Sequence, residues 1–266
     1  MKRFNHIKNR VVPAARALAR DAKALLLAAR SVPALLAPIL LLLPAAAGRL
    51  GPEWLSRLAN MAAALLLTPL FAAMAAVMFS SAWERRPCPL KRAAGAVRGK
   101  ILRVLATGLC VWAGSLALDL VTGLIGSLAG LLNTLTGWIP GVGAVVGALG
   151  SALLWLAMLA QEFIAHTALV CGMAALMAEG LWALPQARRA LVILWGGRTD
   201  SLPSLGALFA AWIAARAAAA LIGALAGGPV AAIAACVIDA CLTAVSAAAV
   251  MAVYLRERDR QGGWTV

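Results

Sequence analysis

The stretch LWLAMLAQEFIAHTALVCGM, residues 154–173, decides the fold class of this chain. Apart from Gln161, Glu162, His166 and Thr167 it contains only apolar residues and glycine. About 20 such residues form a helix long enough to cross the ~30 Å hydrocarbon core of a bilayer. The stretch therefore predicts a transmembrane helix, and its polar residues raise the question of a site inside the membrane.

The composition of the whole chain supports a membrane protein. Of its 266 residues 63% are hydrophobic, against roughly 45–50% in soluble domains, and only 13% are charged. Tyrosine and phenylalanine are scarce, whereas membrane β-barrels carry girdles of aromatic residues. We expect an all-α fold, a polytopic transmembrane helix bundle of about six spans with amphipathic interfacial helices. The expected spans are 32–48, 59–82, 101–132, 139–178, 203–227 and 229–255.

The positively charged residues indicate how these spans are oriented. With even topology, 21 of the 24 Lys and Arg residues fall on one side of the membrane. Because Lys and Arg in short loops stay on the cytoplasmic side, we expect a bacterial inner-membrane protein with both termini in the cytoplasm. The net charge of +14 then reflects topology and implies no nucleic-acid partner. Besides the bilayer itself, anionic lipids at the cytoplasmic face are expected partners.

Two segments have the pattern of helices that lie along the membrane surface. Residues 1–30 place basic residues on one helical face and apolar residues on another, which predicts an N-terminal interfacial helix. These residues lack a small-residue cleavage site after a single apolar core, so we do not expect a removable signal peptide. A second interfacial helix is expected near 180–196, inside a single membrane domain at 31–255 that precedes a cytoplasmic tail at 256–266.

The two central spans are expected to form a tight antiparallel hairpin. As continuous helices 101–132 and 139–178 would be ~48 and ~60 Å long, so they must tilt, break or protrude from the bilayer. The segment between them, LLNTLTGWIPGVG, is rich in turn-forming residues. Gly126 and Gly130 on one side and Gly143 and Gly147 on the other have the spacing that lets helix backbones approach closely.

Two short segments resemble a known group of proteins. The first is AEG at 178–180 followed by ALPQARRALVILWGGR at 183–198, and the second is AVYLRERDRQGG at 252–263. They are similar to elements of six-helix bacterial membrane proteins, the YciC-like proteins and the membrane module of glycerophosphodiester phosphodiesterases. The chain differs from that group in having no proline directly before Glu179 and no serine after Arg189. The resemblance implies a membrane module without catalytic residues of its own.

Five ionisable residues lie inside the expected spans: Asp119, Glu162, His166, Arg216 and Asp239. A charge at the centre of a membrane helix costs about 2.5–3.5 kcal/mol on insertion scales, so each should face the bundle and find a partner. Arg216 and Asp239 lie at similar depths in neighbouring spans, and we expect them to pair. Glu162 and His166 are four residues apart on one helix face and can hydrogen-bond. This intramembrane polar cluster is either a path for protons or a substrate, or a structural link between spans.

Other kinds of site find little support in the sequence. A metal centre would need more ligands than Glu162 and His166 supply, because the only other histidine is His6 and the five cysteines form no C-x-x-C pair. No phosphate-binding glycine loop, G-x-S-x-G or H-E-x-x-H motif is present. We therefore expect no metal, no cofactor and no enzymatic activity.

These observations lead to two functional hypotheses. The first is a non-catalytic integral inner-membrane protein that acts as an accessory, assembly or membrane-organising subunit, with a protein partner or in a homo-oligomer. The alternative is a small-solute or ion transporter that uses the intramembrane polar cluster. No internal repeat relates residues 1–133 to 134–266, although many transporters are built from such repeats.

Overall fold

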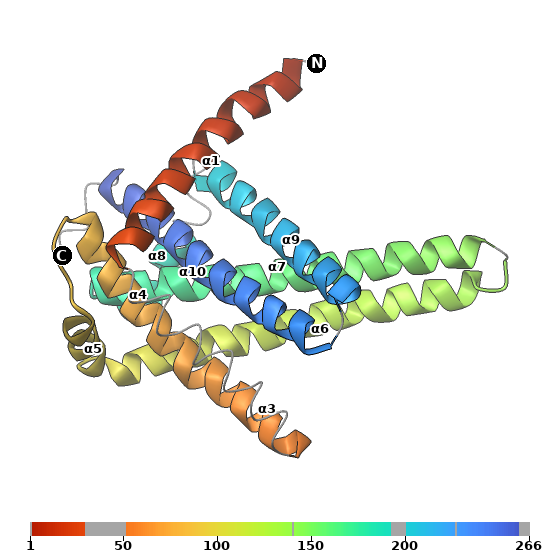
Figure 1. The fold of residues 1–266 in the computed structure, drawn as a ribbon, viewed down its shortest axis with the longest axis horizontal. Coiled ribbons are helices and arrows are strands. Elements are labelled where there is room, and N and C mark those ends of the chain that lie inside the picture. Colours follow the sequence, from red (N-terminus) through yellow and green to blue (C-terminus); the bar gives the residue numbers. More distant parts are fainter. Residues whose placement is uncertain (1, 30–51, 140, 193–200, 227, 261–266) are drawn as a thin grey trace. The chain divides into compact units, whose positions relative to one another are not determined.

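The computed structural model describes residues 2–29, 52–139, 141–192, 201–226 and 228–260 (Figure 1). All regular elements in these residues are helices, so the expected all-α fold is confirmed for the described part of the chain. The helices form two compact units. We call Met1–Leu109 with Thr167–Val266 the core unit, and Cys110–His166 the hairpin unit.

Four helices in the described part of the chain are long and apolar enough to cross a membrane. They are Glu53–Trp83, Ile101–Thr136, Val142–Ala178 and Leu202–Ile222, and they overlap the second to fifth expected spans. The expected span 32–48 lies outside the described residues. The span expected at 229–255 lies in α10, where many side chains are also outside them. The helices indicate a membrane protein, while the count of about six spans stays a prediction.

The core unit is built around the second half of α10. Residues 247–255 of this helix are all buried, from Ala247 to Leu255, which means that the helix is covered on every side. Their burial places this segment in the interior of the core unit. The complete helices of this unit are α1 (Lys2–Ala28), α3 (Glu53–Ala62), η1 (Ala63–Leu67), α4 (Thr68–Trp83), α5 (Leu90–Arg98), α8 (Leu184–Leu191), α9 (Ser201–Ala226) and α10 (Gly228–Arg260). The unit also contains the start of α6 (Ile101–Thr136), up to Leu109, and the end of α7 (Val142–Ala178), from Thr167.

Helix α1 packs against α9, α10 and α4. It buries one face that includes Leu18, Ala22 and Leu25, while Arg16 and Lys23 on the opposite face are exposed. The Arg256 guanidinium of α10 forms an ion pair with Asp21 of α1, with Nε 2.8 Å from Oδ2. The segment expected to be an interfacial helix is thus fastened to the bundle through its apolar face and one ion pair.

The end of α10 also contacts the end of α4. The Trp83 indole Nε1 donates a hydrogen bond to Asp259 Oδ2 at 2.8 Å, and Arg258 lies 3.5 Å from Glu84 in an ion pair. Helix α10 continues through Arg260, so the first five residues of the expected tail at 256–266 are helical. Residues 261–266 lie outside the described part.

A proline and a glycine bring α4 and α6 close together. Pro69 has no backbone N–H, and it follows the π-helical segment η1, where Thr68 Oγ1 donates to Ala63 O at 3.0 Å. On α6, a Cβ placed on Gly108 would overlap the ring of Pro69, with only 2.8 Å to its Cβ. The absence of a side chain at Gly108 is therefore what lets the two helices approach at this point.

The hairpin unit consists of the adjoining parts of α6, from Cys110, and α7, up to His166, and these parts run side by side (Figure 1). An added Cβ on Gly143 would lie 2.7 Å from Gly137 Cα, and one on Gly147 would lie 2.9 Å from Asn133 Oδ1. The expected close approach at these two glycines is confirmed. Gly130 was expected to take part as well, but a Cβ there would meet no atom within 4 Å.

Candidate functional site

The five residues predicted to form a polar cluster are distributed over both units. Asp119 lies on α6 in the hairpin unit, and Glu162 and His166 lie on α7, with Glu162 exposed and His166 half-buried. On α9, the Arg216 guanidinium carbon lies 5.7 Å from the centre of the buried Trp212 ring, a cation–π geometry. The side chain of Asp239 is outside the described residues, so its predicted pairing with Arg216 stays a prediction.

Within the hairpin unit, Gln161 connects the two helices. Its amide nitrogen donates to Asp119 Oδ1 and to the Ser115 carbonyl oxygen, at 3.3 Å for the latter. Its amide oxygen accepts a hydrogen bond of 3.2 Å from Thr122 Oγ1. We call Ser115, Asp119, Thr122 and Gln161 the hairpin patch. The pairing of Asp119 with Gln161 was not predicted, although Gln161 stands out as an amide in an apolar run.

The most deeply buried charges described lie in the core unit, outside the predicted cluster. Arg189 of α8 forms an ion pair with Glu179, at the end of α7, with a distance of 3.1 Å between Nε and Oε2. The two side chains are only 2% and 7% exposed. The Tyr254 hydroxyl of α10 donates a hydrogen bond to Glu179 Oε1. These three residues, the buried ion-pair cluster, join α7, α8 and α10.

A second set of hydrogen bonds fixes α8 to α6 and α7. The buried amide of Gln186 donates to the Gly172 carbonyl oxygen at 2.8 Å and to Thr107 Oγ1 at 3.0 Å. A Cβ on Gly172 would lie 3.3 Å from the Thr107 methyl group, so a glycine at this position lets both partners come close. Thr107 Oγ1 also lies 2.8 Å from the Arg103 carbonyl oxygen, to which it donates.

The chain between α7 and α8 reverses direction in a tight turn. Gly180 has a φ of 72° and Ala183 a φ of 57°, both in the region that favours glycine. The Leu181 N–H donates to the Ala175 carbonyl oxygen at 3.0 Å, which ends α7. Pro185 lies in the first turn of α8, where its missing N–H costs nothing. The turn thus directs the polar side of α8 back onto the ends of the spans.

The polarity of α8 is the reverse of that of a helix on the surface of a soluble protein. Gln186 and Arg189 face the protein and are buried, while Leu184 and Leu191 face outward with exposures of 78% and 62%. A helix in water would show the opposite polarity. The sequence does contain a pattern that indicates the buried face of α8: Gln186 and Arg189 are three residues apart and lie on the helix face opposite the leucines.

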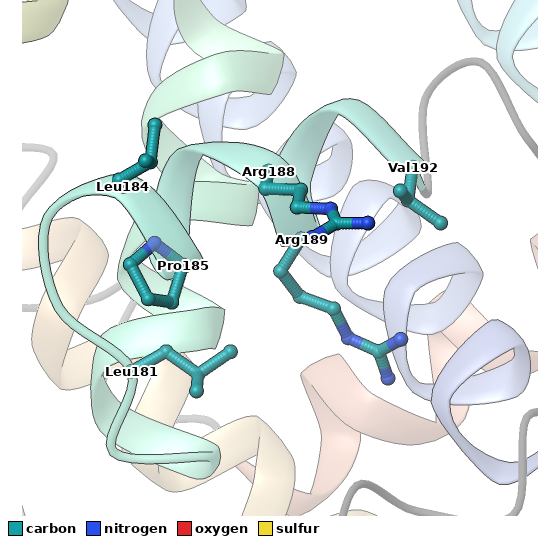
Figure 2. A pocket seen from close by; sticks show the side chains of 6 residues that line it. All are labelled: Leu181, Leu184, Pro185, Arg188, Arg189 and Val192. Atoms are coloured by element: carbon teal, nitrogen blue, oxygen red, sulfur yellow. The ribbon is translucent and has the colours of Figure 1, made fainter.

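A pocket of about 260 Å³ lies beside α8 (Figure 2). Four apolar and two basic side chains line it: Leu181, Leu184, Pro185, Val192, Arg188 and Arg189. Figure 2 shows Leu181, Leu184 and Pro185 on one side of the space and the two arginines with Val192 on the other. The pocket is therefore apolar with a positively charged edge.

The polar side chains described above are suited to binding and to linking helices. Within the described ranges no three His, Cys, Asp or Glu side chains come together in a way that could hold a metal ion. The buried carboxylate of Glu179 is occupied by a guanidinium and a phenol, so it serves as a link between three helices. Comparisons of the chain with protein-family models, with curated proteins and with solved structures gave no match.

Proposed function

We propose that this protein is a non-catalytic integral subunit of a bacterial inner membrane, with about six spans and both termini in the cytoplasm. Its role is accessory: it assembles with, or organises, other components of that membrane. The proposal keeps the expectation that the chain resembles the six-helix YciC-like proteins. The observation that supports it is that polar side chains in the described residues form hydrogen bonds and ion pairs between helices.

Three polar side chains form hydrogen bonds or ion pairs that link one helix to another. Gln161 joins α6 to α7, Gln186 joins α8 to α6 and α7, and Glu179 joins α7 to α8 and α10. In membrane proteins such contacts stabilise the association of helices, because the hydrophobic effect does not drive helices together within lipid. A protein whose buried polar groups serve mainly this purpose is suited to a structural role.

The hairpin unit offers a surface for a protein partner. Its outer faces carry exposed apolar side chains, including Leu120, Leu124, Leu128, Val145, Leu149 and Leu153. Among them lies Asp119 of the hairpin patch, which is exposed on α6. A carboxylate at membrane depth is costly next to lipid, and a polar or basic group on a partner surface would offset that cost. This favours a partner that covers the patch.

The same carboxylate favours the second candidate function, transport of a small solute or ion. Asp119 and Glu162 are acidic residues in two adjacent candidate spans, and acidic side chains at such positions often bind cations in transporters. The accessory role is preferred because Asp119 is held by Gln161 across the hairpin.

The two functions are separated by purification from native membranes followed by reconstitution. The accessory role predicts a partner recovered at constant stoichiometry, which is lost from Asp119→Leu and retained by Leu102→Ala, a change of an exposed leucine of the core unit outside the proposed partner surface. Both variants should reach the membrane at wild-type levels. Purified protein that moves solute across liposomes without any partner, and loses this in Asp119→Asn, would establish transport instead.

A further inference from the structure

The short helix α8 lies at the level where two candidate spans end. Candidate span Ile101–Thr136 begins, and Val142–Ala178 ends, at this side of the core unit. Lys100 Nζ donates to the Leu176 carbonyl oxygen at 3.1 Å, which places the start of α6 next to the end of α7. Helix α8 follows six residues after Ala178. It therefore lies at the boundary between the hydrocarbon core and the headgroups.

The outer face of α8 fits that boundary. Leu184, Leu191 and Val192 are exposed on it. Trp182, just before the helix, is partly exposed and stacks with the Arg103 guanidinium at 5.9 Å from the ring centre. Leucine and tryptophan next to arginine are typical of helices that sink into the headgroup region of a bilayer. This face is therefore in contact with lipid.

Two arginines line the pocket, and one of them is available to bind an anionic ligand. Arg189 is neutralised by Glu179 in the buried ion-pair cluster. Arg188 is exposed and has no acidic partner among the described residues. The pocket that both line is apolar apart from them and, at about 260 Å³, is smaller than the pockets of about 300–1,000 Å³ that enclose drug-sized ligands. Its size suits part of one acyl chain, and its charge suits a phosphate.

We infer that the pocket beside α8 is a binding site for one anionic glycerophospholipid of the surrounding bilayer. The first methylene groups of an acyl chain lie against Leu181, Leu184, Pro185 and Val192, and the headgroup phosphate pairs with Arg188. The site goes beyond the general attraction of anionic lipids to a basic surface, because it is a defined place with its own shape. It holds whether the protein is an accessory subunit or a transporter.

The test is native mass spectrometry of the full chain in detergent, titrated with dioleoylphosphatidylglycerol or dioleoylphosphatidylcholine. We expect one phosphatidylglycerol to bind more tightly than phosphatidylcholine. Arg188→Gln should weaken phosphatidylglycerol binding about fivefold, the effect of one basic residue at a membrane surface. Val192→Trp, which fills the pocket without changing charge, should weaken binding of both lipids.

The matched control is Arg92→Gln, which removes an exposed arginine of α5 that does not line the pocket. It should leave lipid binding unchanged. Equal losses in Arg188→Gln and Arg92→Gln would show diffuse attraction to the basic surface and overturn the inference. Equal affinity of the wild-type protein for both lipids would do the same, as would displacement of phosphatidylglycerol by equimolar inorganic phosphate. Elution as a single species in detergent checks that each variant is folded.

Discussion

Replacing Glu179 by alanine should destabilise the core unit severely. The change leaves the Arg189 guanidinium, which is 2% exposed, without its carboxylate, and it removes the acceptor of the Tyr254 hydroxyl. Breaking a buried ion pair by removing one partner costs about 3–5 kcal/mol, because the remaining charge is left in a medium of low polarity. This is a large part of the 5–15 kcal/mol that stabilises a typical folded protein.

Thermal unfolding of the detergent-purified protein measures this loss. A cost of 3–5 kcal/mol lowers Tm by roughly 6–20 °C in a chain of this size. Tyr254→Phe removes only the hydrogen bond to the charged Glu179 carboxylate and should cost about 1.5–3 kcal/mol. The double variant Glu179→Leu with Arg189→Met replaces the pair by apolar side chains, and it should be more stable than Glu179→Leu alone.

The control for Glu179→Ala is Arg57→Ala, because the pair of Arg57 with Glu53 is exposed on both sides, at 77% and 80%. Its loss should cost less than about 0.5 kcal/mol. If Glu179→Ala and Arg57→Ala lowered Tm equally, or if the double variant were no better than Glu179→Leu, the buried ion-pair cluster would not be what holds α7, α8 and α10 together.

Three further predictions concern packing, backbone strain and topology. Gly108→Ala forces α6 away from Pro69 and should lower Tm, whereas Gly114→Ala on the same helix meets open space and should be neutral or slightly stabilising; equal effects would contradict the packing argument. Ala183→Gly should raise stability by about 1 kcal/mol, because alanine at a φ of 57° is strained; a loss measured by the same unfolding assay would contradict this. In a variant that retains only Cys88, a membrane-impermeant maleimide should label the protein in inside-out vesicles and not in intact cells, and labelling from outside would reverse the expected orientation.

Hydrophobic runs and turn residues were enough to predict much of the fold. Length and polarity located the four candidate spans among the described residues, because a helix needs about 20 apolar residues to cross the ~30 Å hydrocarbon core. The close approach at Gly143 and Gly147 followed from side-chain size alone. Gly130 shows the limit of this argument, since its spacing is the same but no neighbour lies close.

The buried contacts were harder to predict than the spans. Five ionisable residues stand out in the sequence because they interrupt apolar runs: Asp119, Glu162, His166, Arg216 and Asp239. The most deeply buried charged side chains among the described residues are nevertheless Glu179 and Arg189, just outside the candidate spans. Their burial depends on the turn at Gly180 and Ala183, which brings α8 back onto α7 and α10. The spacing of Gln186 and Arg189 marks the polar face of α8, but it does not indicate that Glu179 is the partner of Arg189.

The central position of α10 has a consequence for how the protein is made. Its fully buried segment, residues 247–255, is synthesised after all the described helices that pack around it. Until it has been made, α1 and α4 can contact each other but not the surface of α10, and Glu179 and Arg189 lack the Tyr254 hydroxyl. Assembly of the core unit is therefore completed only after translation of its last described helix, and the earlier helices need protection from other membrane proteins during that interval.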